Sequence, residues 1–196
     1  MNKTKIGIFG GTFDPIHLGH LITAQEVLTT CSLEKVIFVP SADPPHKESR
    51  RLTHAEDRLK MVSLAIARDS RFEVSAIELE RPGKSYTVDT LRQMGTSFGA
   101  KVGLCFIIGA DNVPEIRTWK QPEVIFDLAE VIVATRPGFE PHSMDEPFVE
   151  RMTFVSTPEI ALSSTEIRRR VKRGWPIGYW VSEAVVQYIA DNRLYV

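Results

Sequence analysis

The sequence predicts an α/β fold with a doubly wound, mainly parallel sheet, in a single domain spanning residues 1–196. Two observations predict this fold. Short apolar runs typical of buried strands alternate along the chain with longer stretches of helical periodicity. The composition, 43% apolar and 25% charged over 196 residues, is that of a globular protein with one sizeable core.

Strands are expected where short apolar runs, rich in β-branched residues, end at turn-forming residues. These runs are residues 6–9, 36–39, 72–79, 102–108 and 131–134, with a last strand ending at Val155. The run at 72–79 alternates, as a strand with one solvated face does, whereas 102–108 is apolar nearly throughout, as a strand covered on both faces is. Gly10 and Gly11 after the first run predict a glycine turn into a helix.

Helices are expected where the apolar period changes to three or four residues. They are predicted at residues 19–30, from residue 53 onward, and at 87–94, 164–173 and 181–188. Thr53 and Glu56 have the spacing of a capping box, and Thr87 is a candidate N-cap. Ligands of doubly wound sheets bind at the carboxyl ends of strands, so the loops after residues 9, 39, 108 and 134 are the first candidates for a site.

Charge and cysteine content bear on the function and the surroundings expected for this chain. The chain has 24 Lys and Arg against 25 Asp and Glu, a net charge of −1, which disfavours a general nucleic-acid binder. Cys31 and Cys105 have no metal-ligand or CxxC spacing and are expected to be reduced thiols. With no signal-like or membrane-length apolar run, we expect a cytoplasmic protein without membrane contact and without a protein metal site, and homo-oligomer formation stays open.

The segment GGTFDPIHLGH, residues 10–20, is the first candidate site. Gly10 and Gly11 let backbone N–H groups approach a phosphate, and Gly19 removes a side chain that would crowd a bound group. His17 and His20 lie three residues apart at a helix entry and therefore face the same side. Without a third ligand nearby, they suit charge stabilisation on phosphate oxygens better than zinc, and the alternative is a glycine turn with two surface histidines.

The segment LSSTEIR, residues 162–168, predicts a second phosphate site. Ser163, Ser164 and Thr165 precede a helix whose first amides lack partners, and Arg168 adds a cationic fork. The alternative is an N-cap with a solvated basic face. That alternative is preferred for the neighbouring basic residues, which are Arg169, Arg170, Lys172 and Arg173.

Four further residues stand where a ligand would contact strand ends, each with a structural alternative. Asp111, after Gly109, suits ribose hydroxyls or an N-cap. Trp119 suits stacking on a flat aromatic ring or packing on the next helix. Lys47 and Arg136 follow strands and would reach a phosphate or belong to loop surface.

Five segments, in order, resemble the HxGH nucleotidylyltransferase superfamily, and the GGTFDP preface resembles its bacterial nicotinate-nucleotide adenylyltransferases. The segments are GGTFDPIHLGH, PPHK at 44–47, SYTVDTL at 85–91, GADNVPEIRTW at 109–119 and LSSTEIR. The resemblance spans nearly the whole chain and implies a Rossmann-like nucleotidyltransferase fold. Lys120 departs from it, because some members carry an aromatic residue at that position.

The resemblance implies that ATP and nicotinate mononucleotide are joined into nicotinate adenine dinucleotide with release of pyrophosphate, and that Mg²⁺ enters with ATP. His17, His20 and Arg168 would act on the phosphates, with Asp14 a turn residue rather than a base. ATP would also contact Gly10, Gly11, Thr12, Phe13, Gly19, Gly109, Asp111, Ser163, Ser164 and Thr165. The acceptor would contact Lys47, Thr87, Trp119 and Arg136, with the tryptophan on the pyridine ring and the threonine at its carboxylate.

Two alternatives remain open at this stage. One is a sibling transferase with another acceptor, such as nicotinamide mononucleotide or phosphopantetheine, or one that makes a CDP-alcohol. The other is a nucleotide-sensing module that binds without reacting.

Overall fold

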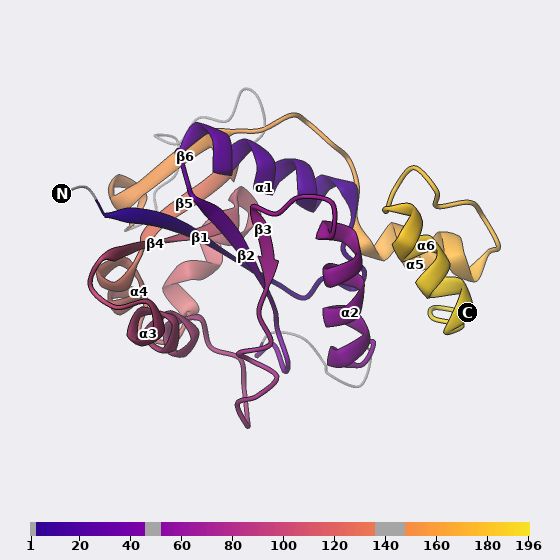
Figure 1. Cartoon of the computed structure of the whole chain (residues 1–196), viewed down its shortest axis with the longest axis horizontal. Coiled ribbons are helices and arrows are strands. Elements are labelled where there is room, and N and C mark those ends of the chain that lie inside the picture. Colours follow the sequence, from indigo (N-terminus) through magenta and orange to yellow (C-terminus); the bar gives the residue numbers. More distant parts are fainter. Residues whose placement is uncertain (1–2, 46–51, 136–147) are drawn as a thin grey trace.

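One six-stranded parallel sheet organises the chain (Figure 1). The computed structural model describes residues 3–45, 52–135 and 148–196. The strands are β1 (Thr4–Gly11), β2 (Lys35–Pro40), β3 (Phe72–Val74), β4 (Val102–Gly109), β5 (Glu130–Thr135) and β6 (Met152–Ser156). Their order is β3-β2-β1-β4-β5-β6, and every pairing is parallel. The chain therefore reverses its winding beside β1, which confirms the predicted doubly wound sheet.

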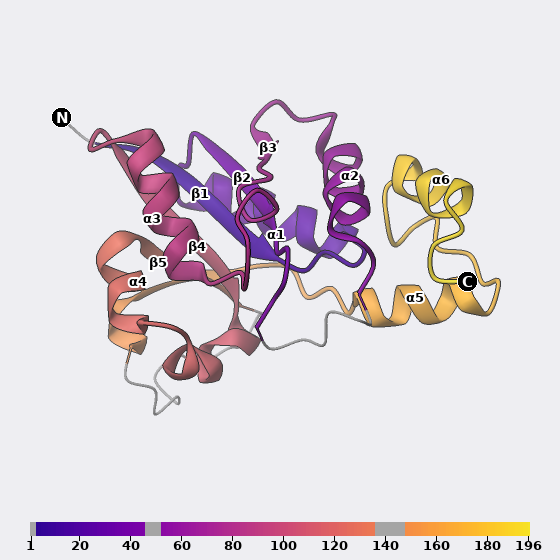
Figure 2. The ribbon, with the colours of Figure 1, turned by 90° about the horizontal axis from the view of Figure 1, so that it is seen from below.

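Helices cover both faces of the sheet. They are α1 (Leu18–Thr30), α2 (Ala55–Ile66), α3 (Thr87–Phe98), α4 (Pro122–Leu128), α5 (Ser164–Lys172) and α6 (Glu183–Asp191), with short 3₁₀ segments η2 (Ala110–Thr118) and η4 (Val149–Arg151). Figure 2 shows α5 and α6 beside α2 at one end of the molecule, with α3 and α4 at the other.

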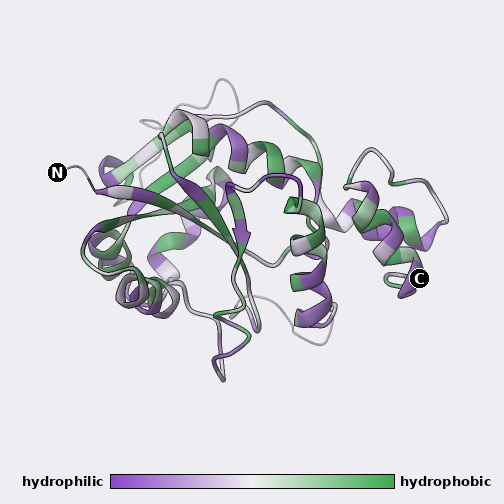
Figure 3. Cartoon of the chain, in the orientation of Figure 1, coloured by the Kyte–Doolittle hydropathy of each residue, from purple (hydrophilic) through white to green (hydrophobic). Residues whose placement is uncertain are grey.

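Alternation along the strands divides the core into two layers. Ile107 of β4 and Ile132 of β5 belong to the core cluster on the face of α1 and α2, to which apolar residues of α5 and α6 also contribute. Phe106 and Ile108 of β4 point to the opposite face, which α3, α4 and η2 cover. The strands β2, β4 and β5 are buried over most of their length and largely apolar, whereas the edge strands β3 and β6 are mostly half-buried or exposed. Figure 3 shows hydrophobic residues along much of the sheet.

Two strand predictions differ from the structure. Gly10 and Gly11 are not a turn after β1 but its last residues, paired with Val39 and Pro40. The strand predicted at 72–79 ends at Val74, after which the amides of Leu79 and Glu80 both donate to the Ala76 carbonyl in a turn.

The shorter β3 follows from a buried carboxylate. Glu78 is only 6% exposed, and its Oε1 accepts a 2.6 Å hydrogen bond from the Thr90 hydroxyl of α3. The turn at Ala76 brings Glu78 inward to this partner, so the polar positions of 72–79 reflect a turn and not the solvated face of a strand.

Both predicted N-caps are wrong. The N-cap of α2 is His54, without a side-chain cap bond, because the backbone of Thr53 is used elsewhere: its N–H donates to Asp14 Oδ2 (3.4 Å), and its carbonyl accepts from Arg58 Nε (3.0 Å). The N-cap of α3 is Tyr86, so Thr87 is the first helical residue, and the helix continues to Phe98 instead of ending near residue 94.

Arg58 of α2 forms hydrogen bonds with the loops that follow β1 and β2 and with the residue before the N-cap of α2. Its side chain is 1% exposed, and it donates to three backbone carbonyls: Thr12 (2.7 Å), Ala42 (3.4 Å) and Thr53 (3.0 Å). Burial lowers the pKa of the guanidinium, while the charge of Asp14 opposes that effect. The cation thus supplies the hydrogen bonds that three irregular segments would otherwise lack.

We expect Arg58→Met to lower the free energy of unfolding by about 3 kcal/mol or more, because three carbonyls lose their donor at once. Urea unfolding monitored by circular dichroism measures this loss. Arg92→Met is the matched control, since Arg92 lies on the surface of α3 in an exposed ion pair with Asp89, and it should cost under about 1 kcal/mol. Equal losses in the two variants would contradict the role given to Arg58.

Candidate active site

A cavity of about 610 Å³ lies at the carboxyl ends of the central strands. Its lining includes residues from the ends of β1, β2, β4 and β5, namely Gly11, Val39, Gly109 and Thr135. A second hollow adjoins it, bounded by the loop after β1 and by the start of α5. The cavity thus lies at the strand ends where the reversal of winding predicts a ligand site.

His17 and His20 form a reciprocal capping box at the N-terminus of α1. His17 is the N-cap, and its Nδ1 accepts from the His20 amide (3.4 Å), while His20 Nδ1 accepts from the His17 amide (3.2 Å). The two rings stack with their centroids 3.6 Å apart. The spacing of the two histidines is that of the Ser/Thr-x-x-Glu capping box, with imidazoles in both positions.

The two hydrogen bonds also determine which ring nitrogens donate. Since each Nδ1 accepts from an amide, the neutral rings carry their hydrogens on Nε2. Burial lowers the pKa of His17 to about 4, and its side chain is 8% exposed. His17 is therefore a neutral N–H donor at a helix N-terminus, a position that favours anions.

Two glycines of this segment avoid collisions with the site's own aromatic rings. A Cβ on Gly11 would lie 2.8 Å from the Phe13 ring, and Phe13 itself adopts a left-handed conformation with φ of 49°. A Cβ on Gly19 would lie 3.0 Å from His17 Nδ1. The structure gives a second reason for these glycines: a side chain at either position would crowd Phe13 or His17, and both glycines also line the cavity.

The start of α5 is joined to the loop after β1. Ser163 caps the helix by accepting from the Glu166 amide (3.2 Å), and the Ser164 hydroxyl donates to the Pro15 carbonyl (2.9 Å). Arg168 Nη1 donates to the Asp14 carbonyl (2.7 Å), and its Nη2 donates to the Thr165 hydroxyl (3.2 Å). Residues 149 and 154 positions apart in the sequence thus form one wall of the second hollow.

The other arginines of α5 interact locally. Arg169 forms an ion pair with Glu166 (2.6 Å), and Arg170 lies 4.2 Å from the centre of the Trp180 ring. Arg169 and Arg173 flank Trp175, which is 45% exposed. These contacts agree with the predicted structural role of this basic face, and only Arg168 of the group lines a cavity.

Thr87 and Trp119 line the opposite end of the first cavity. Thr87 is the first residue of α3, so its amide has no partner within the helix. Trp119 contacts the edge of Phe106, with ring centroids 6.1 Å apart. Trp119 therefore packs on the core and also lines the cavity, and its stacking on a ligand ring stays a prediction.

Lys120 and Asp111 occupy the rim of the same end. Lys120 Nζ lies 2.8 Å from Asp89 Oδ2 and 4.5 Å from the centre of the Tyr86 ring, so it ties η2 to α3. Asp111 is exposed and caps no helix, since the N-cap of η2 is Gly109. A Cβ on Gly109 would collide with the Asp111 carboxylate, which explains the glycine there.

The predicted site residues on described segments all line one of the two hollows. Lys47 and Arg136, together with His46, lie outside the described residues. Within residues 3–45, 52–135 and 148–196, no three His, Cys, Asp or Glu side chains are arranged to hold a metal ion. No helix in that part of the chain is long and apolar enough to cross a membrane.

Sequence reasoning missed the side chains that support the site. Arg58 had a detectable signal, because it shares the buried face of α2 with Met61 and Val62, three and four residues on. Asp14 is more than a turn residue: it is 2% exposed, and its Oδ1 accepts a 2.7 Å hydrogen bond from the Tyr195 hydroxyl. Nothing local in the sequence indicates this contact across 181 positions.

A Rossmann-like sheet whose first strand leads into an HxGH capping box, with an Arg-bearing helix start opposite, defines a nucleotidyltransferase. A family model described as Cytidylyltransferase-like matches residues 8–170, and the chain belongs to that family. Within it, the chain groups with the nicotinate-nucleotide adenylyltransferases.

Two relatives support this grouping, and a solved structure shares the fold. A probable nicotinate-nucleotide adenylyltransferase of Desulfitobacterium hafniense is 46% identical, covering 97% of this chain and 95% of the relative. One of Moorella thermoacetica is also 46% identical, covering 97% and 91%. The nicotinic acid mononucleotide adenylyltransferase of Plasmodium falciparum complexed with NaAD shares the fold, with a TM-score of 0.78 at 20% identity over 98% of this chain and 97% of that one.

We expect His17→Asn to reduce the loss of stability in acid. Histidine in an unfolded chain has a pKa of about 6.5, and burial lowers the pKa of His17 to about 4 in the folded protein, so the unfolded chain binds the proton first as the pH falls. Stability is thus lost from about pH 6.5 down to 4, by about 3 kcal/mol from this group. Asparagine caps the helix without titrating there.

Urea unfolding of both proteins at pH 7 and pH 4 measures the difference. The wild type should lose more stability than the variant by that amount, since other groups titrate in both proteins. Parallel losses would show that His17 is not buried in its neutral form.

Proposed function

We propose that this chain, acting as one domain, transfers the adenylyl group of ATP to nicotinate mononucleotide, giving nicotinate adenine dinucleotide and pyrophosphate. One observation carries the proposal: the N-termini of α1 and α5 meet at the loop after β1, with His17, His20 and Arg168 on the adjoining hollows. Two helix N-termini with neutral and cationic N–H donors suit a polyphosphate. The names of the relatives at 46% identity support the same reaction.

The reaction needs no protein nucleophile. A phosphate oxygen of the mononucleotide attacks the α-phosphorus of ATP in line, the bond from that phosphorus to the bridging oxygen breaks, and pyrophosphate leaves. Catalysis then consists of positioning and charge stabilisation, by His17 and His20 on the reacting phosphates and by Arg168 with the start of α5 on the leaving group. Mg²⁺ enters as part of the substrate, bound to outer phosphate oxygens of ATP.

The acceptor would lie at the N-terminus of α3. Its carboxylate would accept from the Thr87 amide and hydroxyl, and its pyridine ring would stack on Trp119. Lys120 at the rim adds a positive charge, which favours the carboxylate of nicotinate over the amide of nicotinamide. Its ion pair with Asp89 reduces this effect.

Pyrophosphate release with ATP and each acceptor tests the proposal against its alternatives. Nicotinate mononucleotide should support turnover. Turnover only with phosphopantetheine or another phosphorylated acceptor would identify a sibling transferase. ATP binding without pyrophosphate release from any acceptor would identify a nucleotide-sensing module.

We expect His20→Ala to lower kcat by about 10² to 10³, because a donor to charge developing in the transition state is lost. Its cap bond to the His17 amide is lost too, at a cost of about 1 kcal/mol in stability. His54→Ala is the control, since exposed His54 makes no cap bond, and it should leave kcat unchanged. Retention of more than a third of wild-type kcat by His20→Ala would remove His20 from the mechanism.

The wild type should prefer nicotinate over nicotinamide mononucleotide by about 10² or more in kcat/KM, because the amide's NH₂ would face N–H donors. Trp119→Ala should lower kcat/KM for both acceptors, since stacking does not distinguish the substituents. Thr87→Val should mainly narrow the preference, whereas Thr96→Val, farther along α3 and outside both cavity linings, should not. Steady-state kinetics measure all four proteins, and equal use of the two acceptors would overturn the acid-specific assignment.

A further inference from the structure

Tyr195, in the segment that follows α6, reaches back to the loop after β1. Its hydroxyl donates a 2.7 Å hydrogen bond to Asp14 Oδ1, and its ring packs against the core between the sheet and α2. Burial and the negative charge of Asp14 raise the pKa of this phenol, so it stays a donor at neutral pH. Tyr195 lines neither hollow.

Asp14 connects this tyrosine to the proposed triphosphate site. Its Oδ2 accepts from the Thr53 amide (3.4 Å), and its backbone carbonyl accepts from Arg168 Nη1 (2.7 Å). The next residue, Pro15, accepts from the Ser164 hydroxyl at the start of α5 (2.9 Å). The orientation of the Arg168 guanidinium thus depends on where the Asp14 backbone lies.

We propose that Tyr195 is a positioning residue for the triphosphate end of the site, acting through Asp14 on Arg168. This inference rests on the proposed function, since it takes Arg168 as a ligand of the ATP phosphates. Tyr195 donates to one oxygen of a carboxylate on a residue that is 2% exposed, and the backbone carbonyl of that same residue holds Arg168. Without that donor, the carboxylate oxygen becomes an unpaired buried acceptor and must move to find another partner. The Asp14 backbone would move with it, and the carbonyl that holds Arg168 would shift.

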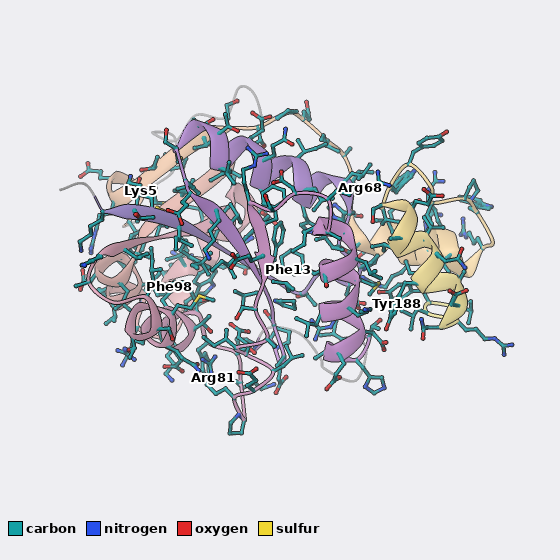
Figure 4. The ribbon with its side chains drawn as sticks, in the orientation of Figure 1. Lys5, Phe13, Arg68, Arg81, Phe98 and Tyr188 are labelled. Carbon is teal, nitrogen blue, oxygen red and sulfur yellow. The ribbon has the colours of Figure 1, made fainter. Side chains whose placement is uncertain are left out.

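A second tyrosine offers a matched control. The Tyr188 hydroxyl of α6 donates to Asp57 Oδ1 of α2 (2.8 Å), and Figure 4 shows Tyr188 between these two helices. Tyr188→Phe and Tyr195→Phe each remove one phenol-to-aspartate hydrogen bond while keeping the ring. Asp57 lines neither hollow, so only Tyr195→Phe disturbs a carboxylate connected to Arg168.

The test compares kcat, the KM for ATP, the KM for nicotinate mononucleotide and the melting temperature of the wild type and both variants. We expect Tyr195→Phe to raise the KM for ATP about tenfold, the value of one hydrogen bond to a charged group, with the acceptor KM within about twofold of wild type. Tyr188→Phe should leave both KM values unchanged. If Tyr195 had a purely structural role, Tyr195→Phe would lower the melting temperature without raising the KM for ATP more than the KM for nicotinate mononucleotide.

A double-mutant cycle sharpens the test. If Tyr195 acts through Arg168, Tyr195→Phe should change the KM for ATP far less in an Arg168→Lys background than in the wild type. Additive effects would overturn the inference, as would an unchanged KM for ATP in Tyr195→Phe or an equal rise for both substrates.

Binding of pyrophosphate by calorimetry separates this inference from the proposed function. If the wild type releases no pyrophosphate from ATP and nicotinate mononucleotide, the proposed function fails. In that case, about tenfold weaker pyrophosphate binding by Tyr195→Phe, but not by Tyr188→Phe, would still support the positioning role, and equal binding by all three proteins would overturn it.

Discussion

The site depends on one constraint, the burial of the Arg58 guanidinium. The loops after β1 and β2 are irregular, and their carbonyls lie where no strand or helix can pair them. Arg58 pairs three of these groups from inside α2. A cation is costly to bury, but here it faces carbonyl oxygens and the nearby charge of Asp14, which offset that cost. The loop that leads to His17 and into α1 is thus held at Thr12 by Arg58.

Sequence reasoning succeeded where the signal was local or periodic, and it failed where distant groups compete for the same backbone. The sheet could be predicted because the runs at 36–39 and 102–108 are apolar nearly throughout, which a surface segment would not be. The histidine pair follows from its spacing at a helix entry. The prediction that Thr53 caps α2 was wrong because the backbone groups of Thr53 bind Asp14 and Arg58 instead. The prediction of a strand over 72–79 was wrong because Glu78 turns inward to a hydrogen bond with Thr90 on α3.

Anion binding here does not rest on an excess of positive charge. The chain has a net charge of −1, His17 is neutral because it is buried, and several arginines of α5 interact with Glu166 and with tryptophan rings. The groups left to bind a phosphate are directional hydrogen-bond donors: helix N-termini, imidazole N–H groups and Arg168, which the Asp14 carbonyl holds in place. Such a site recognises a phosphate by its position and shape, so a basic surface elsewhere on the protein is not required.

The sheet separates the two halves of the site. The residues proposed to meet the triphosphate lie on α1 and α5, which pack on one face, whereas Thr87 and Trp119 belong to elements packed on the other face. The residues proposed to hold the acceptor ring and those proposed to hold the reacting phosphates thus belong to different core layers. Repacking around Thr87 and Trp119 would change the shape of the acceptor pocket from a layer that contains neither His17 nor Arg168.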